Sequence, residues 1–478
     1  MSTATVRTYV VRGLSAYPVD LVCEIRLGLP TFDLIGFDPA TVRDVRALVL
    51  RELRPYVGLE WPGGPVASRV TVTAATVGPE LGVSHVWPAA LAVLSAMGEV
   101  ANPIPPCVGE EAVGLAQCVM AMAPDTHLLF PDRHAAEALA MQRDDVHLLV
   151  APTLDAAVKG EWALLADALE QRVDQMVQES PARTLAHRML DWCDVRDSTQ
   201  ALGLKRVLEI AAAGGHHTLI LENSGLYPVS GVMMLARRMP GILPPLSIQE
   251  RRILIQMQSG LRAGLDTTTI AGWRPLRAPL YSTVGMPNEA ALAYGGVLAL
   301  EDLPEYLPET HAFLVDKPGR YTIVATSPHV SRLPVLQKAR GLLGLFDLQW
   351  RAPSVDAPCD DGPRETSEDV RARVAAAWAR QDLRYGGECL RNGRVDPGTF
   401  MARAFDTIEP AALEWAAEHA AARYGQKHVD AELAPLCRLA RTIADLRDVD
   451  TVQMQDLSEA LDMRAMSEPQ DTKKRRAK

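Results

Sequence analysis

The stretch with the clearest chemical potential is residues 217–241, HTLILENSGLYPVSGVMMLARRMPG. An apolar run at residues 218–221 leads into a loop that contains Gly225, Ser230 and Gly231. A helical run over residues 231–239 follows, and Pro240-Gly241 is expected to close it. A strand, a glycine-containing loop and a helix in this order present main-chain N–H groups and a helix N-terminus to a phosphate. The stretch therefore predicts the frame of a nucleotide-binding loop.

The side chains that such a loop uses are missing from this frame. A working loop reads G-x-x-x-x-G-K-[ST], because a lysine must reach the phosphates and a hydroxyl must hold Mg²⁺. Here Val232 and Met233 follow Gly231, and five residues separate Gly225 from Gly231. Loss of the lysine alone removes a charged hydrogen bond worth about 1.5–3 kcal/mol. We expect ATP hydrolysis to be lost, and weak binding of ATP and Mg²⁺ is left open.

Composition narrows the classes of protein. A net charge of -10 and a pI of about 5.6 exclude a protein coated in basic surface for duplex nucleic acid. Seven scattered cysteines without a C-x-x-C pair exclude a zinc cluster and a disulfide framework, and indicate the reduced thiols of a cytoplasmic protein. No apolar run approaches the roughly 18 residues of a membrane span, so no membrane partner is expected.

Hydrophobic periodicity predicts an α/β domain over residues 1–170. Val19, Leu21 and Cys23 alternate with polar neighbours, as strand residues do on a half-buried sheet. Further strands are expected at residues 70–73, 128–130 and 146–150, and helices at 39–53, 88–97 and 134–141. Strand, helix and strand over residues 128–150 form a βαβ pattern. A polar linker is expected at residues 171–190.

The second half predicts a parallel sheet flanked by helices over residues 191–351, followed by a linker at 352–365 and a helical region at 366–465. Strands are expected at residues 218–221, 297–300 and 321–325, and helices at 200–213, 370–383, 410–424, 431–446 and 452–461. Thr366 and Ser367 are candidate N-caps. The basic end, residues 466–478, is expected to be a disordered tail.

Several spaced segments carry a family resemblance. They read, in order, GLPTFDLIGFDPATVRDVRALV, DVRDSTQALGLKRVLEIAAAGGHHTLIL, MLARRMPGILPPL, WRPLRAPLYST, YGGVLALEDLPEY, LLGLFDLQWRAPSV and CRLARTIADL. These segments resemble the Mg-chelatase-like AAA+ ATPases of the competence type, the ComM/YifB family. The resemblance implies an N-terminal domain like the Lon protease domain, an AAA+ P-loop-type α/β core and a C-terminal helical lid. It also implies hexameric rings that couple ATP hydrolysis to remodelling of branched or single-stranded DNA.

The departures from the family pattern occur at the positions that are expected to bind or hydrolyse ATP. Val232 and Met233 stand where the family has the P-loop lysine and threonine. Glu301-Asp302 reverses the order of the Walker B pair, Asp-Glu, which changes how far each carboxylate reaches. Ser327 replaces the sensor asparagine.

Two further departures concern the arginines and the DNA-facing segment. Leu345 replaces the arginine expected to act on a neighbouring subunit's nucleotide, whereas Arg438 and Arg441 remain as candidates for the lid's sensor arginine. Only residues 307–320 stand where the family's DNA-facing hairpin is expected.

Other candidates have competing interpretations. Arg274 and Arg277 would meet a phosphate or a DNA backbone, or form surface ion pairs, which are commoner. His216-His217 suggests a metal, but no third ligand is evident and a structural turn is favoured, so no metal site is predicted. Ser84 would need Lys159 as a base for peptidase chemistry, and a capping or packing role is favoured.

The leading hypothesis is a non-hydrolysing scaffold or regulatory subunit of a ring assembly. It would form a homo- or hetero-oligomer, for which an active AAA+ relative is one candidate partner, and DNA is left open as a partner. The rival hypothesis is an ATP-binding, DNA-remodelling ATPase in which Glu301 and Asp302 still serve catalysis. A Lon-like peptidase is the third.

Overall fold

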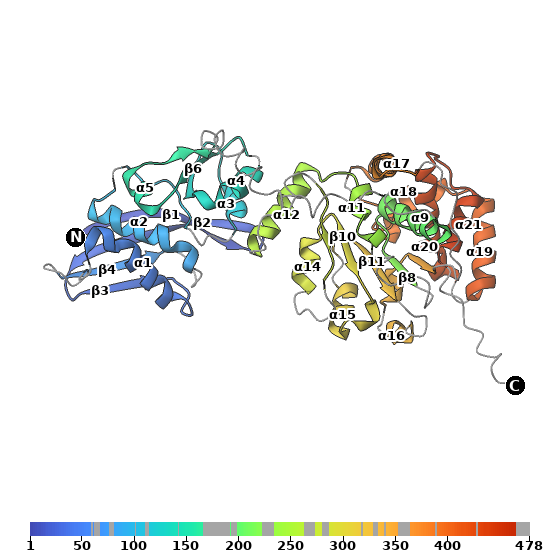
Figure 1. Cartoon of the computed structure of the whole chain (residues 1–478), viewed down its shortest axis with the longest axis horizontal. Coiled ribbons are helices and arrows are strands. Elements are labelled where there is room, and N and C mark those ends of the chain that lie inside the picture. Colours follow the sequence, from blue (N-terminus) through green and yellow to red (C-terminus); the bar gives the residue numbers. More distant parts are fainter. Residues whose placement is uncertain are drawn as a thin grey trace. The chain divides into compact units, whose positions relative to one another are not determined.

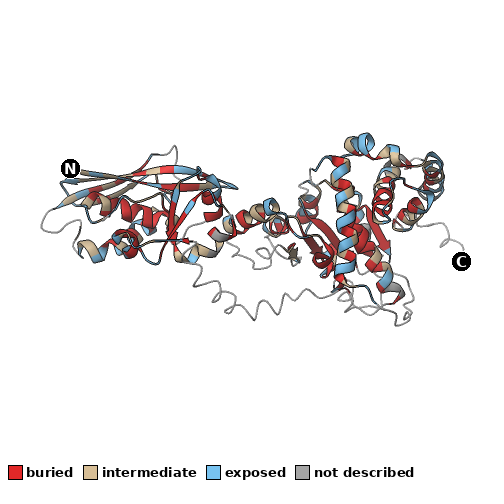
Figure 2. Ribbon diagram, turned by 90° about the horizontal axis from the view of Figure 1, so that it is seen from above, coloured by how far each residue is buried: buried red, intermediate tan, exposed pale blue. Residues whose placement is uncertain are grey.

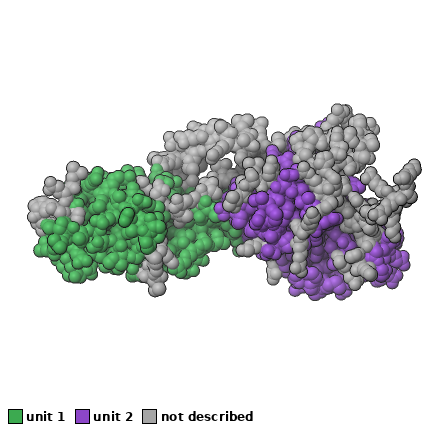
Figure 3. All heavy atoms as spheres, turned by 90° about the horizontal axis from the view of Figure 1, so that it is seen from below, with its two compact units in different colours: residues 1–186, 248–270 green, residues 187–247, 271–478 purple. Residues whose placement is uncertain are grey.

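The computed structural model describes most of the chain in two compact units. The described residues are 1–58, 61, 67–75, 81–100, 102–109, 114–141, 143–165, 192, 198–221, 234–261, 273–279, 286–316, 319–327, 333–338, 341–351, 364–387, 390–426 and 429–464. Unit 1 comprises residues 1–186 and 248–270, and unit 2 comprises residues 187–247 and 271–478 (Figure 3). Residues 248–270 thus belong to unit 1, which the sequence did not indicate.

Unit 1 is built on a four-stranded mixed sheet (Figure 1). Its strands, in spatial order, are β1 (Ser2–Arg12), β2 (Ser15–Leu27), β4 (Ser68–Ala74) and β3 (Thr31–Ile35). The first two neighbouring pairs are antiparallel, and β3 runs parallel to β4. Val19, Leu21 and Cys23 are buried in one cluster with helices α1 (Val42–Val57) and α2 (Val86–Met97). The predicted strand alternation and both predicted helices are confirmed.

A smaller sheet completes unit 1. Strands β5 (His127–Pro131) and β6 (His147–Ala151) are parallel and are joined through α4 (Ala135–Ala140), which confirms the βαβ pattern. A short antiparallel strand, β7 (Ala163–Leu164), pairs with β6. Helix α12 (Ile248–Gly260) packs on α3 (Leu115–Ala121) and α4. Unit 1 also contains the 3-10 helix η1 (Val83–His85) and helix α5 (Leu154–Lys159).

Unit 2 contains an all-parallel five-stranded sheet. Its strands, in spatial order, are β12 (Leu348–Arg351), β8 (Thr218–Leu221), β11 (Thr322–Ser327), β10 (Val297–Leu300) and β9 (Leu276–Arg277). Successive strand residues enter different hydrophobic clusters: Ile220 packs with α9 (Thr199–Gly214) and the helical region, whereas Leu219 packs with α14 (Met286–Leu292) and α15 (Pro308–Asp316). Both faces are therefore buried, as Figure 2 shows for the strands of this sheet.

The C-terminal part of unit 2 is helical. It comprises α17 (Ser367–Tyr385), α18 (Pro397–Arg403), the 3-10 helix η7 (Phe405–Thr407), α19 (Pro410–Tyr424), α20 (Val429–Leu446) and α21 (Met454–Asp462). Thr366 caps α17 through a capping box with Asp369, which confirms one of the two candidate caps. These helices share one hydrophobic cluster with α9 and the sheet. The mixed α/β class with a parallel sheet and a C-terminal helical region is confirmed.

One local prediction is wrong. Pro240-Gly241 does not close a helix, because both residues lie inside α11 (Met239–Ile242). Pro240 occupies the first turn, where the missing N–H costs no hydrogen bond. The segment at residues 307–320 contains α15 rather than a hairpin in its described part.

The described residues bear on the expectations for membrane spans and for cysteines. None of the helices there combines the length and the apolar character that a bilayer-spanning helix needs. The four cysteines among them are buried and free of disulfides: Cys23, Cys107, Cys118 and Cys437.

Candidate functional site

The predicted phosphate loop follows β8. Gly225, Ser230, Gly231, Val232 and Met233 all lie outside the described residues. The strand that leads into the loop has the predicted bounds, Thr218–Leu221. In a parallel sheet every strand ends at the same edge, so the loop leaves from the carboxyl edge, where α/β proteins bind ligands.

The structure brings three other predicted site residues to that edge. Glu301 and Asp302 directly follow β10, and Ser327 is the last residue of β11. The strand register places Ser327 opposite Leu221, the last residue of β8. Both acids are half-buried, whereas Ser327 is completely buried. The Walker-B-like pair and the sensor-like serine therefore share the edge from which the phosphate loop departs.

Asp302 has an unusual main-chain conformation. Its φ of 51° and ψ of 59° lie in the left-handed region, which aspartate tolerates better than most residues. Its main-chain N–H donates to the Thr326 hydroxyl at 3.0 Å. This turn starts the 3-10 helix η4 (Leu303–Glu305), and the Leu303 carbonyl contacts the His311 ring at 2.9 Å. The turn fixes where the two carboxylates stand.

The charges of the acidic pair act on a neighbouring tyrosine. Burial raises the pKa of Tyr306, and the charges of Glu301 and Asp302 raise it further. The Tyr306 hydroxyl donates to the Pro279 carbonyl at 2.6 Å. Within the described part of the chain, no group of three His, Cys, Asp or Glu side chains converges as a metal site.

A second polar cluster, unrecognised in the sequence, lies at the opposite edge of the same sheet. His216 precedes β8 and Asp347 precedes β12, so both stand at the amino ends of parallel strands. The His216 Nδ1 lies 2.8 Å from the Asp347 Oδ2, and its Nε2 lies 2.8 Å from the Thr442 hydroxyl. We call His216, Asp347, Thr442 and Arg438 the amino-edge cluster.

The Thr442 hydroxyl, the His216 imidazole and the Asp347 carboxylate are linked in the same order as the groups of a nucleophilic triad. The burial of these three residues points to a structural role instead. His216 and Thr442 have no exposed surface, and Asp347 is 4% exposed. Asn392 also donates to the Thr442 hydroxyl, at 3.0 Å. A nucleophile needs access to substrate. The cluster instead ties the sheet to α20.

Arg438 belongs to this amino edge. Its Nη2 donates to the Asp347 Oδ1 at 2.8 Å. Burial alone would raise the pKa of Asp347, but hydrogen bonds and charges from His216 and Arg438 outweigh it and hold that pKa well below its usual range. Burial lowers the pKa of His216 despite the attraction of Asp347. We therefore take Asp347 as ionised and His216 as neutral near pH 7.

Two neighbours complete the amino edge. The His217 Nδ1 accepts the Ile323 N–H at 2.8 Å, and burial together with the charge of Arg394 lowers the pKa of His217 well below its ordinary value. Arg394 donates to the carbonyls of Gly215 at 2.8 Å and Gly319 at 3.2 Å, and burial lowers its pKa to about 10. Each histidine thus has hydrogen bonds that fit a structural role.

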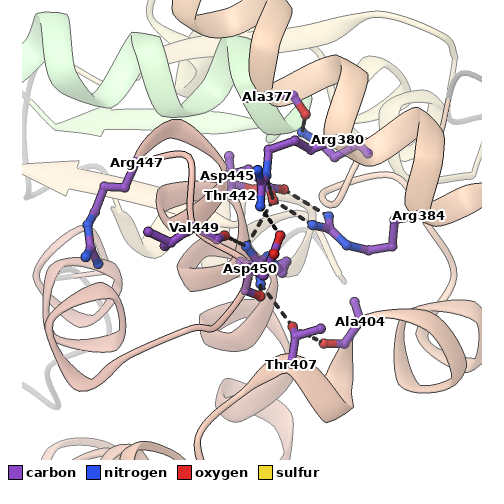
Figure 4. Close-up of polar contacts among 12 residues, drawn as sticks. Ala377, Arg380, Arg384, Ala404, Thr407, Thr442, Asp445, Arg447, Val449 and Asp450 are labelled. Atoms are coloured by element: carbon purple, nitrogen blue, oxygen red, sulfur yellow. Dashed lines mark hydrogen bonds and ion pairs between the residues drawn. The ribbon is translucent and has the colours of Figure 1, made fainter.

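Arg441, the other sensor candidate, is enclosed by the helical region, where its partners Thr407, Asp445 and Val449 converge (Figure 4). It has no exposed surface, and its guanidinium donates to the Thr407 hydroxyl at 3.0 Å, to Asp445 at 3.0 Å and to the Val449 carbonyl at 2.6 Å. Arg384 also donates twice to Asp445. Burial lowers the pKa of Arg441 although Asp445 opposes the shift. These contacts join α20 to α17 and to the turn before α21.

Arg274 fits neither of its predicted interpretations. It is 5% exposed and donates to the main-chain carbonyls of Pro244, Gly295 and Pro245. It is therefore neither a surface ion pair nor a free phosphate ligand. Arg277 is half-buried at the end of β9, and its role toward phosphate stays a prediction.

The two residues considered for peptidase chemistry, Ser84 and Lys159, do not include an activated base. Lys159 ends α5 and donates to Asp155 at 2.5 Å. This hydrogen bond raises the pKa of Lys159, whereas a lysine base must have a lowered pKa. Ser84 lies in η1, and its carbonyl accepts the Gly109 N–H at 3.1 Å. These contacts favour a structural serine.

Comparison with known proteins identifies relatives of both parts of unit 2 and of the whole chain. The family model described as magnesium chelatase, subunit ChlI, matches residues 191–318, and that of the ChlI C-terminal region matches residues 364–464. The protein YifB of Escherichia coli strain K12 is 28% identical, and YifB of Salmonella typhimurium is 27% identical. The competence protein ComM of Haemophilus influenzae is 25% identical. Each alignment covers 98% of this chain and 98% of the relative. The chain is thus similar over nearly its whole length to the Mg-chelatase-like proteins YifB and ComM, and both magnesium chelatase family models support a place in that family.

Proposed function

We propose that this protein is a non-hydrolysing member of its family that serves as a scaffold or regulatory subunit of a ring assembly. The observation that carries the proposal is the donor set at the carboxyl edge. Two half-buried carboxylates, Glu301 and Asp302, stand there beside a completely buried Ser327. Val232 and Met233 occupy the loop positions that need a cation and a hydroxyl.

Glu301 and Asp302 could ligate Mg²⁺, but their side chains offer no cation to a triphosphate. A triphosphate needs cations and N–H donors, because its negative charge grows along the reaction path. Glu301 and Asp302 supply only negative charge, and Asp302 is held in a left-handed turn by Thr326. Ser327 is completely buried at the end of its strand and has a hydroxyl where the family's asparagine has an amide. No catalytic step is therefore assigned to this edge.

Arg438 and Arg441, the arginines retained from the lid segment, make contacts away from the predicted nucleotide site. Arg438 pairs with Asp347 at the amino edge, away from the strand ends that carry Glu301 and Ser327. Arg441 is enclosed by the helical region. Their contacts support a role in holding the helices to the sheet, and the sensor role stays a prediction without support from these contacts.

The scaffold role rests on the persistence of the fold beside the loss of this chemistry. The helical region, α9 and the sheet share one continuous hydrophobic cluster. A member that keeps its packing can occupy a place in a ring without turning over nucleotide. We infer a homo- or hetero-oligomer, with an active AAA+ relative as the natural partner, and a cytoplasmic location in keeping with buried free cysteines.

Calorimetric titration with ATP and Mg²⁺, together with a radiolabelled ATPase assay, tests the proposal. We expect no turnover and no binding at micromolar nucleotide. The double variant Val232→Lys, Met233→Thr should gain at least about tenfold in ATP affinity, because it restores one charged hydrogen bond. The matched control Val335→Lys adds a lysine at an exposed position of α16 (Leu333–Lys338) and should gain nothing.

Turnover at ordinary AAA+ rates would overturn the proposal if the double variant Glu301→Gln, Asp302→Asn abolished it. That result would assign the chemistry to this edge. Turnover that survives the double variant would identify a contaminating ATPase, and the proposal would stand.

A second candidate function is supported by Arg277. This arginine ends β9, the strand beside β10, and its Nε has no hydrogen-bond partner among the described residues. A cation near the carboxyl edge favours an ATP-binding, DNA-remodelling ATPase with an unusual loop. Fluorescence anisotropy with forked DNA tests it: nucleotide-dependent binding that Arg277→Gln removes would favour this candidate.

A further inference from the structure

Two exposed histidines lie side by side at the amino edge of the smaller sheet of unit 1, in a part of the chain that none of the functions above uses. His127 begins β5, and His147 begins β6. The two strands are parallel, and their register places His127 opposite His147. The ring centroids lie 4.7 Å apart, and the ring planes meet at 29°. We call His127 and His147 the histidine pair.

The backbone around the histidine pair fixes this arrangement. The His147 N–H donates to the Thr126 carbonyl at 2.8 Å, and the Asp125 N–H donates to the Asp145 carbonyl at 2.8 Å. The two residues that follow each histidine are buried in two different hydrophobic clusters, so both strands are anchored: Leu128, Leu129, Leu148 and Leu149. Strand register therefore sets the spacing of the two imidazoles.

The ring nitrogens of the pair are available to a ligand. Both side chains are exposed, and no hydrogen bond or ion pair of either ring is found in the described part of the chain. Imidazole is a preferred ligand of Zn²⁺, Cu²⁺ and Ni²⁺. Two imidazoles that bind one Zn²⁺ at about 2.0–2.1 Å have ring centroids roughly 5 Å apart. The pair has nearly this separation, so rotation about exposed side-chain bonds can bring one nitrogen of each ring to a shared ion.

The charged groups beside the pair do not repel a cation. Asp125, Asp144 and Asp145 lie just before the two strands and are exposed. Arg143 forms an ion pair with Asp145, and the charge of Arg252 acts on the same carboxylate. Three carboxylates thus stand against two guanidinium groups in these segments. The balance leaves a small excess of negative charge near the histidine pair.

We propose that the histidine pair binds one divalent transition-metal ion, such as Zn²⁺, through one ring nitrogen of each histidine, with water at the remaining coordination positions. The ion would bridge the first residues of β5 and β6 and so hold the two strands of the βαβ unit together. This site differs in chemistry from any Mg²⁺ bound with nucleotide in unit 2, because Mg²⁺ prefers oxygen ligands. The proposal is independent of whether the protein hydrolyses ATP.

Stacking without a metal is the rival explanation of the pair. Ring contacts between neighbouring strands stabilise a sheet modestly, and any two aromatic side chains can make them. Stacking does not require nitrogen atoms that are exposed and without other partners. A metal ion requires both, and both are found at His127 and His147.

Isothermal titration of the metal-free full chain with Zn²⁺ tests the proposal. We expect one saturable ion per chain, and excess Mg²⁺ should not compete. His127→Gln and His147→Gln should each weaken binding by about a hundredfold, because attachment at two points becomes attachment at one. His419→Gln is the matched control, since His419 is also exposed but stacks on Trp415 rather than on a second histidine. This control should bind Zn²⁺ as the parent does.

Thermal melting gives a second measurement. Zn²⁺ should raise the melting temperature of the parent protein but not that of His147→Gln, because an ion that binds only the folded chain stabilises it. A parent chain without saturable Zn²⁺ binding would overturn the proposal. So would binding that both variants retain, or binding that His419→Gln weakens, because the ion would then lie elsewhere. If one variant of the pair does not fold, the other decides.

Discussion

His216 is the residue at which segments far apart in the sequence meet. Asp347 contacts one ring nitrogen, and Thr442 contacts the other. A Cβ on Gly214 would lie 2.3 Å from the ring, so the Gly214 position must lack a side chain for the imidazole to fit. Residues 214–217, which read GGHH, and residues 345–348, which read LFDL, thus supply a histidine with room for its ring and the carboxylate that pairs with it.

Stability should fall as the pH drops below about 6.5, because His216 and His217 are neutral in the folded protein. Burial lowers the pKa values of both histidines in the folded protein. At a pH between the folded-state and the unfolded-state pKa of a histidine, the unfolded chain therefore binds more protons than the folded chain. Each histidine then loses up to about 1.4 kcal/mol of stabilisation per pH unit in that window. Asp347 does not contribute to the pH dependence of stability in that window, because its lowered pKa affects stability only near and below about pH 4.

Thermal melting followed by tryptophan fluorescence between pH 8 and pH 5.5 measures this slope. His216→Gln should melt lower than the parent at pH 8 but lose less on acidification. His419→Gln is the matched control, because His419 is exposed and bonded only within its own helix. Equal slopes for His216→Gln and the parent protein would contradict the prediction.

Sequence reasoning located part of the candidate site for an identifiable reason. Glu301, Asp302 and Ser327 follow or end short apolar runs, so a correct strand prediction places them at the strand ends. The amino-edge cluster offered no such signal. His216 and Asp347 are 131 residues apart, and Asp347 and Arg438 are 91 apart. Pairing at that distance depends on which strands become neighbours, which local periodicity does not encode.

At the scale of elements, apolar runs and helix-capping residues in the sequence allowed strands and helices to be predicted. Strand β8 and helix α19 have the predicted bounds, because an apolar run and a proline at the first turn mark them. β1 was missed: its core-facing positions include Ala4 and Thr8, which weaken the alternation. The two-residue β9 is too short for any periodicity. Its place in the sheet comes from pairing with β10.

The turn at Gly393 approaches the end of α9 closely and joins the helical region to the sheet layer. The Gly393 N–H donates to the Gly214 carbonyl at 2.9 Å. A Cβ at residue 393 would lie 2.5 Å from the His216 Nδ1 and 3.0 Å from that carbonyl. Gly393→Ala should therefore destabilise the protein by about 1–3 kcal/mol through overpacking.

A lowered melting temperature in the tryptophan-fluorescence transition would support this expectation. Gly344→Ala is the matched control, because a Cβ there meets nothing within 4 Å. Its stability should stay within roughly 0.5 kcal/mol of the parent. A Gly393→Ala variant as stable as Gly344→Ala would show that the junction relaxes without cost.

At the scale of the whole molecule, the chain passes between the two units three times, after residues 186, 247 and 270. The second and third passages exist because α12 belongs to unit 1. The Gln117 side chain donates to the Gln256 carbonyl at 2.8 Å, and Arg252 donates to the Met141 carbonyl at 2.8 Å. Ile255 is completely buried in the cluster formed with α3 and α4. The two units are thus linked by more than the predicted linker.

Cutting the chain in the predicted linker should therefore not separate its halves. With a protease site inserted after Ser180, residues 1–180 and 181–478 should co-elute on size exclusion after cleavage, because the second fragment carries α12 and the first carries its binding surface. Ile255→Asp should release the fragments, since it buries an unpaired charge in that contact. Ile248→Asp, at an exposed position of the same helix, should not. Separation of the parent fragments would mean that α12 does not hold unit 1 once the backbone is cut, and the division of the chain at residues 247 and 270 would have to be redrawn.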